Sequence, residues 1–383
     1  MNFLPLYQEH FQRCLTVSQY QTLTIVVWLL QVQKQVRIER LASCFPLPIL
    51  YESRRKHIQR FLALPKFSIP LFWFPLIQTI INQQFPLGSR LIIALDRTQW
   101  KENNLLVASV IWHQRALPIY WHFLGKDGCS NLAQQQATIR PVLQLLKDYE
   151  IVLIGDREFH SVHLAYWLRT RRGKVYFALR QKQDTYVRRG RKNAQTLRSL
   201  ALFPGKRLFL TGIGITKKKG FGKFNLAGYY KRKYKGKQEK EPWYILTNLT
   251  NLSEVLKVYR TRMGIEAMFK DCKTGGYNLE DSLAKPERLN TLILLIAIAY
   301  TSTALKGKLL KQQGHQKYIA RLKEAKRNRR RHSNFWVGLY GLLWVITYEY
   351  CCHWVEKLMT INPQKLSNYQ KGLKARFLLQ GIV

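Results

Sequence analysis

The fold of this chain is decided by residues 259–273, which read YRTRMGIEAMFKDCK. We expect this stretch to belong to one helix, which Asn251 or Ser253 would cap at its start and a glycine pair at 275–276 would end. At 100° per residue, four side chains would share an arc of about 60° on that helix. They are Tyr259, Arg262, Glu266 and Lys273. One stripe would therefore present a phenol, a guanidinium, a carboxylate and an ammonium group.

Two interpretations of this stripe are open. The common one is an ion pair on a solvated helix face, formed by Arg262 and Glu266 at a spacing of four residues. The other is a metal ligand, Glu266, between cations that bind phosphate. The second interpretation gains weight if the rest of the chain supplies further carboxylates in a suitable place.

Composition points to an anionic partner. The chain has 383 residues, 46% of them hydrophobic, so it can form a sizeable core. Its 63 Lys and Arg residues outnumber 22 Asp and Glu residues, which gives a formal net charge of +41. A surplus of this size indicates a polyanion, with nucleic acid as the main expectation and an anionic membrane surface as the minor one.

The six cysteines show neither CxxC pairing nor a metal-type spacing with histidine. They are typical of free thiols in a reducing cytosol, and they argue against a zinc site. The polar first dozen residues predict no signal peptide.

Two predicted strands lead directly into aspartates. The apolar runs 91–95 and 151–155 are followed by Asp96 and Asp156. We expect further strands at 105–112, 117–124 and 174–180, and helices at 131–148 and 161–170. If the first and fourth strands are neighbours, Asp96 and Asp156 meet at one edge of the sheet. That order is RNase H-like, an arrangement in which a later helix delivers a third acid, here Glu266.

The chain divides into five predicted segments. Residues 1–85 form a helical region, 86–180 and 243–310 the two parts of an α/β core with a mixed sheet, 181–242 a basic β-rich insertion, and 311–383 a helical basic tail. In the first segment, Arg54, Arg55 and Arg60 are either DNA contacts or a solvated face, and the two readings carry equal weight. In the insertion, Lys217, Lys218 and Lys219 lie among aromatic residues, a composition that suits a phosphate backbone. The apolar run 289–305 is shorter than a membrane span and is expected to be a core helix.

With these motifs in place, the chain resembles DDE transposases of insertion sequence family 4. The resemblance rests on Asp96 in LDRT, Asp156 in GDREF, and the spacing of Tyr259, Arg262, Glu266 and Lys273. It implies an RNase H-like catalytic core, interrupted by the insertion, that performs metal-dependent cut-and-paste transposition. Two Mg²⁺ ions, for which Mn²⁺ would substitute, would be bound by Asp96, Asp156 and Glu266. Arg262 and Lys273 would hold a phosphate at an end of double-stranded DNA, and Tyr259 would hydrogen-bond or stack at the same end.

The resemblance also implies a homodimer on paired transposon ends, a target DNA and no membrane, in a bacterial cytoplasm at the nucleoid. Two alternatives stay open. One is an RNase H-like nuclease or resolvase that cuts DNA without joining it, although such an enzyme needs no clamp for an end phosphate. The other is a non-enzymatic protein, either an inactive DNA-binding relic or a basic protein associated with a membrane.

Overall fold

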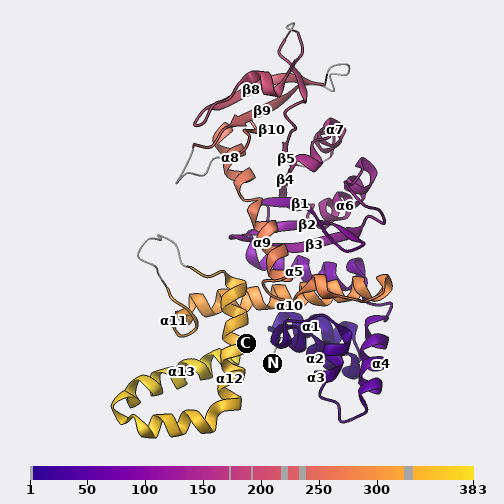
Figure 1. Cartoon of the computed structure of the whole chain (residues 1–383). Coiled ribbons are helices and arrows are strands. Elements are labelled where there is room, and N and C mark those ends of the chain that lie inside the picture. Colours follow the sequence, from indigo (N-terminus) through magenta and orange to yellow (C-terminus); the bar gives the residue numbers. More distant parts are fainter. Residues whose placement is uncertain (1–2, 172–173, 191–192, 217–222, 233–238, 323–330) are drawn as a thin grey trace. The chain divides into compact units, whose positions relative to one another are not determined.

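The computed structural model of the chain describes residues 3–171, 174–190, 193–216, 223–232, 239–322 and 331–383. These residues form two compact units, which are described separately (Figure 1). The sheet unit comprises residues 80–269, and the helical unit comprises residues 1–79 and 270–383. Two helices contain residues of both units: α5 (Phe74–Gln84) and α9 (Met263–Cys272). The chain is a mixed α/β protein, and its division into five segments stays a prediction.

A ten-stranded mixed sheet forms the sheet unit, in the order β3-β2-β1-β4-β5-β10-β9-β8-β6-β7. The pairs β1–β4 and β4–β5 are parallel, and the remaining pairs are antiparallel. The strands are β1 (Arg90–Trp100), β2 (Asn103–Trp112), β3 (Arg115–Phe123), β4 (Glu150–Gly155), β5 (Val175–Arg180), β6 (Tyr186–Arg188), β7 (Gln195–Thr196), β8 (Arg207–Ile215), β9 (Lys223–Tyr229) and β10 (Trp243–Thr247).

The predicted pairing of the first and fourth strands is confirmed. Strands β1 and β4 are parallel neighbours, with Leu91 opposite Ile151 and Leu95 opposite Gly155. Their apolar side chains are buried, as near-continuous apolar runs are in parallel sheets. The expectation that the first strand ends at Asp96 was wrong, because β1 continues to Trp100 in antiparallel pairing with β2. Only the parallel pairing with β4 stops before Asp96.

The strands of the predicted insertion extend the same sheet. Strand β10 pairs with β5 on one side and with β9 on the other, and β8 and β6 follow outward. The insertion was predicted to be β-rich, and β6, β7, β8 and β9 lie within it.

Helices cover both faces of the sheet unit. Figure 1 shows α6 (Leu132–Leu145) and α7 (Val162–Arg169) on one face, with α8 (Leu252–Arg260) and α9 on the other. A short 3₁₀ turn, η2 (Arg157–Phe159), follows β4, and another, η3 (Leu197–Leu200), follows β7. The predicted caps Ser161 and Asn251 accept backbone N–H groups at the starts of α7 and α8.

The predicted single helix through residue 273 is two helices. It breaks between α8 and α9 at Thr261 and Arg262. The Thr261 hydroxyl donates to the Val258 carbonyl at 2.7 Å, and backbone bonds of the three-residue type follow, such as Arg262 N to Tyr259 O at 3.1 Å. Local bonding of a threonine hydroxyl competes with the regular helix and bends it. The four-residue stripe is therefore not carried by one helix.

Helix α10 (Pro286–Gln312) is the centre of the helical unit. Its apolar residues are buried nearly all round, and it contacts α2, α4, α12 and α13. It crosses α12 where Gly307 and Gly338 face each other's backbones, since a Cβ on either residue would lie within about 2 Å of a carbonyl oxygen of the other helix. The other elements are α1 (Pro5–Cys14), α2 (Val17–Gln33), α3 (Ile38–Cys44), α4 (Tyr51–Leu62), η1 (Ile69–Trp73), η4 (Leu279–Asp281), α11 (Gln316–Ile319), α12 (Asn334–Ile361), η5 (Pro363–Lys365) and α13 (Leu366–Ile382).

Among the described residues, α10 is long and apolar enough to cross a membrane by length and composition. The argument that this run is too short for a span was wrong, because the helix has 27 residues. Its burial supports the core-helix prediction instead, since 94% of its most apolar 18-residue window is buried.

Candidate active site

Asp96 lies on β1 at the point where pairing with β4 ends. Its side chain is 15% exposed, and its Oδ1 accepts the Arg97 N–H at 2.8 Å. Burial raises the pKa of Asp96 to about 7; the Arg262 guanidinium and the Arg97 N–H oppose this rise, and the carboxylates of Asp156 and Glu266 add to it. The charges of Asp156 and Glu266 therefore both act on Asp96.

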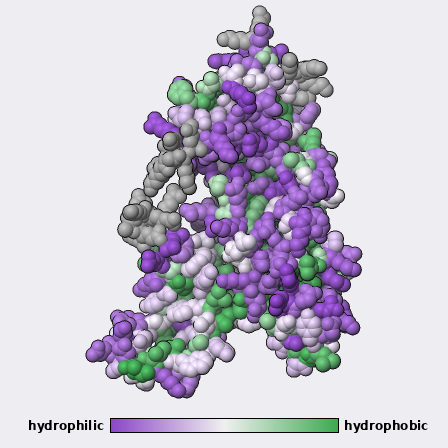
Figure 2. All heavy atoms as spheres, viewed as in Figure 1, coloured by the Kyte–Doolittle hydropathy of each residue, from purple (hydrophilic) through white to green (hydrophobic). Residues whose placement is uncertain are grey.

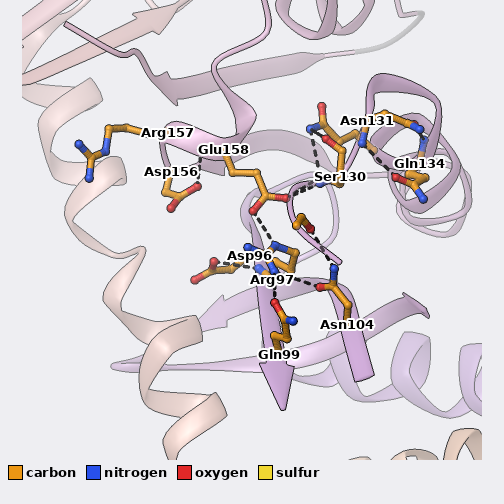
Figure 3. A network of polar contacts seen from close by, with 12 residues as sticks. Asp96, Arg97, Gln99, Asn104, Ser130, Asn131, Gln134, Asp156, Arg157 and Glu158 are labelled. Atoms are coloured by element: carbon orange, nitrogen blue, oxygen red, sulfur yellow. Dashed lines mark hydrogen bonds and ion pairs between the residues drawn. The ribbon is translucent and has the colours of Figure 1, made fainter. Parts of the chain in front are cut away.

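Asp156 follows β4 directly and caps the turn η2. Its Oδ1 accepts the Glu158 N–H at 2.8 Å. Since Leu95 and Gly155 are paired, the two aspartates leave neighbouring strands at the same level (Figure 3). The predicted meeting of Asp96 and Asp156 at one edge is thus a feature of the sheet register.

Glu266 lies in the first turn of α9 and is joined to Asp96 through Arg262. The Arg262 Nη2 lies 2.5 Å from Glu266 Oε1, and its Nη1 lies 3.4 Å from Asp96 Oδ2. The side chain of Arg262 is 16% exposed, and that of Glu266 is 39% exposed. The ion pair between Arg262 and Glu266, four residues apart on the chain, is therefore present. Arg262 also contacts Asp96, an acid from the sheet.

A glycine lets α9 approach the sheet at this point. A Cβ on Gly264 would lie 2.8 Å from the Arg115 carbonyl oxygen at the turn between β2 and β3. Real Cβ atoms essentially never come that close to an oxygen, so this helix position requires glycine. The absence of a side chain there lets the part of α9 that carries Glu266 lie close to the sheet.

The donor chemistry of the three acids suits a hard divalent cation, because carboxylate oxygens are the ligands that Mg²⁺ prefers. Within the described residues, however, no three His, Cys, Asp or Glu side chains gather into a preformed metal-binding group. The Arg262 guanidinium instead supplies a positive charge between Asp96 and Glu266. These residues fit a metal ion on condition that Arg262 releases its two partners.

The other residues of the stripe have separate surroundings. Tyr259 is 3% exposed and packs edge-on against Trp243, with ring centroids 5.1 Å apart. Lys273 lies beyond α9, in the helical unit, where its Nζ pairs with Glu280 Oε1 at 2.6 Å. Contacts of Tyr259, Arg262 and Lys273 with DNA stay predictions.

The predicted basic residues outside the stripe differ from one another. Arg54 donates to the Ser43 and Phe45 carbonyls and thereby links α3 to α4, and Arg55 pairs with Glu52. Arg60 is exposed on α4. The three lysines predicted for the insertion, Lys217, Lys218 and Lys219, lie outside the described residues.

Sequence reasoning missed two residues that accompany the aspartates. Arg97 follows Asp96, and Glu158 stands two positions after Asp156. Arg97 Nε donates to Glu158 Oε2 at 2.8 Å, so the two aspartate motifs are tied together by their neighbours (Figure 3). Arg157, the residue between Asp156 and Glu158, points elsewhere and pairs with Glu241. The sequence did contain a signal: Arg97 and Glu158, which carry opposite charges, stand one and two positions after two acids that were expected to meet.

Comparison with known proteins gives one family match. Residues 128–302 match the family described as "Transposase DDE domain". This range contains Asp156 and Glu266 and begins after Asp96. None of the curated proteins matches the chain.

Among solved structures, the chain is similar to the piggyBac transposase in a cryo-EM synaptic complex with hairpin DNA. The identity is 13% and the TM-score is 0.44, with 88% of this chain and 74% of that chain covered. The family match over residues 128–302 supports a DDE transposase.

Proposed function

We propose that this chain is a transposase of the insertion sequence family 4 type, with an RNase H-like core that cuts DNA at the ends of an element and joins them to a target. The observation that carries the proposal is the association of Asp96, Asp156 and Glu266, which come from β1, the end of β4 and α9. Their order and charge coupling match what a DDE triad requires.

The triad would hold two divalent metal ions, Mg²⁺ or in its place Mn²⁺. When bound, such ions would supply an activated water and neutralise charge on the phosphate and on the leaving oxygen. Asp96 would serve both ions, a role that fits the action of both other carboxylates on its charge. Asp156 and Glu266 would each bind on one side.

The reaction requires no external energy source. In the first step a water oxygen attacks the phosphorus of a phosphodiester, and the bond from phosphorus to the 3′ oxygen breaks. The departing 3′ oxygen takes up a proton, and a 5′ phosphate remains. In the second step that 3′ hydroxyl attacks a target phosphodiester, so one P–O bond forms as another breaks.

Cations of the chain would position the DNA. Once metal ions occupy the carboxylates, the Arg262 guanidinium is released from Asp96 and Glu266 and can bind an end phosphate through a bidentate fork. Lys273 would act at the same end as a point charge, and Tyr259 would hydrogen-bond or stack there. The net charge of +41 supports double-stranded DNA as the partner for both transposon end and target.

A second copy of the chain would complete the assembly on DNA. Helix α12 exposes apolar side chains at spacings of four, four and three residues: Tyr350, Trp354, Leu358 and Ile361. Figure 2 shows hydrophobic residues gathered on the surface of α12 and α13. Such a stripe resembles the seam by which helices of two protomers pack, which supports a homodimer.

A strand-transfer assay tests the proposal. The full chain is incubated with Mg²⁺, a supercoiled target plasmid and a labelled DNA fragment. The 3′ ends of this fragment carry the sequences that flank the gene for this chain. Covalent fragment–plasmid products that require the 3′ hydroxyl would support the transposase. Cleavage without joined products would instead favour the nuclease alternative.

A further inference from the structure

Next to the triad, Arg97 and Glu158 form an ion pair that is largely buried. Arg97 Nε and Glu158 Oε2 lie 2.8 Å apart, with the side chains 21% and 10% exposed. Arg97 lies on β1 and Glu158 in η2 after β4. The pair therefore joins the two strands just beyond Leu95 and Gly155, where their backbone pairing ends.

The backbones of the same two residues orient the aspartates. The N–H of Arg97 donates to Asp96 Oδ1 at 2.8 Å, and the N–H of Glu158 donates to Asp156 Oδ1 at 2.8 Å. Each partner of the ion pair thus holds one triad carboxylate through its main chain. Any change in the separation of Arg97 and Glu158 is transmitted to the separation of Asp96 and Asp156.

Both ends of the pair are anchored to the loop between β3 and α6. Glu158 Oε1 accepts the Ser130 N–H at 2.9 Å and the Ser130 hydroxyl at 2.7 Å. Arg97 Nη1 donates to Asn104 Oδ1 at 3.1 Å, and the Asn104 amide donates to the Lys126 and Gly128 carbonyls. Figure 3 shows Glu158, Arg97, Ser130 and Asn104 in one network next to Asp96 and Asp156. The bonds leave little freedom for either charged group.

We infer that Arg97 and Glu158 are positioning residues: their ion pair sets the spacing and orientation of Asp96 and Asp156 for a shared metal ion. The inference rests on the proposed function. Beyond the last backbone pair the strands separate, so a side-chain tie is the contact that can keep the two carboxylates in register. Metal sites tolerate only about 0.5 Å of error, and partners behind the ligands tune affinity.

The ion pair has a second consequence for the site. Glu158 is a fourth carboxylate close to the triad, and an unpaired one would compete with Asp156 for a cation. Arg97 neutralises it and turns it away from the aspartates, toward Ser130. Loss of Arg97 would therefore disturb metal binding in two ways, through geometry and through a misplaced charge.

Direct titration of Mn²⁺ into the full chain, followed by calorimetry, separates this role from a purely stabilising one. The variants are Glu158→Gln, Arg97→Lys, and the double variant Arg97→Lys with Glu158→Gln. The matched control is Glu150→Gln, which removes the pair between Arg90 and Glu150 at 3.0 Å, at the far end of the same two strands. Free energies of unfolding in EDTA are measured for all four proteins.

We expect Glu158→Gln to weaken Mn²⁺ binding about 10- to 100-fold, the range typical of partners behind metal ligands. Arg97→Lys keeps the charge and is expected to lose less. The double variant should bind about as weakly as Glu158→Gln alone, because both changes break one contact. Glu150→Gln should bind Mn²⁺ like the wild type at a comparable stability.

Two other results would overturn the inference in different ways. Wild-type affinity in a folded Glu158→Gln protein, or an equal loss in Glu150→Gln, would remove the positioning role and leave the proposed function standing. If the wild type does not bind Mn²⁺, or if Asp156→Asn binds it as well as the wild type does, the proposed metal chemistry itself is contradicted. The positioning role is then contradicted with it.

Discussion

Leu95 and Gly155 are the last paired residues of the parallel strands β1 and β4, and each is followed at once by an aspartate. This register places Asp96 and Asp156 side by side, and the ion pair of Arg97 with Glu158 ties their surroundings together. Helix α9 then adds Glu266 through the arginine that contacts both Asp96 and Glu266. The site is thus built from a sheet register and one helix, the rigid elements that suit a metal-dependent reaction.

Glu266→Gln is expected to abolish DNA cleavage while leaving DNA binding intact. The amide cannot supply the negative charge that a divalent cation requires, so cleavage should fall at least about 100-fold. Cleavage and gel-shift assays on the same DNA check this. Glu287→Gln, at the start of α10, is the control. An equal loss of binding and cleavage in Glu266→Gln would indicate a structural role for this residue.

Arg262→Gln is expected to destabilise the metal-free protein and to tighten its binding of Mn²⁺. In the wild type the guanidinium compensates Asp96 and Glu266, and its removal should cost about 2–4 kcal/mol in EDTA. Because Arg262 and the metal compete for the same carboxylates, the variant should gain more stability from Mn²⁺ than the wild type does. Chemical unfolding with and without Mn²⁺ measures both effects, with exposed Arg13→Gln as control. A smaller gain in the variant would show that Arg262 assists metal binding.

Asp96→Asn is expected to make metal-free stability less dependent on pH. Burial raises the pKa of Asp96 from an ordinary value near 3.8 to about 7. Between these values the folded state holds a proton that the unfolded state has released, so the contribution of Asp96 to stability is complete below about pH 4 and is lost as the pH rises to about 7. The loss for this one group is about 4 kcal/mol, which Asp96→Asn removes.

The measurement is the free energy of unfolding in EDTA between pH 4 and pH 8. The exposed Asp148→Asn serves as control and should retain the wild-type slope. If wild type and Asp96→Asn change in parallel over this range, Asp96 is not the titrating group.

Gly264→Ala is expected to separate α9 from the sheet. The new methyl group would lie 2.8 Å from the Arg115 carbonyl oxygen, so the helix must shift, at a cost of about 1–3 kcal/mol. Since Glu266 moves with the helix, cleavage should fall as well. Gly372→Ala in α13 meets no atom within 4 Å and should be neutral or slightly stabilising. Full cleavage activity in Gly264→Ala would mean that the approach of α9 is not required.

Local patterns were sufficient for the strands and for the pairing of the two aspartates. Apolar runs with β-branched residues, each followed by an acid, identify β1 and β4, and the cap residues Ser161 and Asn251 identify two helix starts. The break at Thr261 escaped prediction because it depends on a hydroxyl–carbonyl bond and on the approach of Gly264 to a distant turn.

Tertiary contacts explain the other differences. Lys273 was expected on the stripe of Arg262, yet the helix break and its pairing with Glu280 give it separate surroundings. The tie between Arg97 and Glu158 joins residues 61 positions apart, so only the pairing of β1 with β4 could have revealed it. The continuation of the sheet through the insertion likewise depends on the pairing of β10 with β5 and β9.

The most direct test of the central claim is cleavage of a DNA fragment that carries the sequences flanking the gene for this chain. Wild type and Asp156→Asn are compared in Mg²⁺ and in EDTA, with Asp148→Asn as a matched control. We expect the wild type and Asp148→Asn to release a 3′ hydroxyl at a fixed boundary in Mg²⁺ only, and Asp156→Asn to release none. Cleavage that persists in EDTA, or that Asp156→Asn performs as well as the wild type, would contradict a metal-dependent triad of Asp96, Asp156 and Glu266.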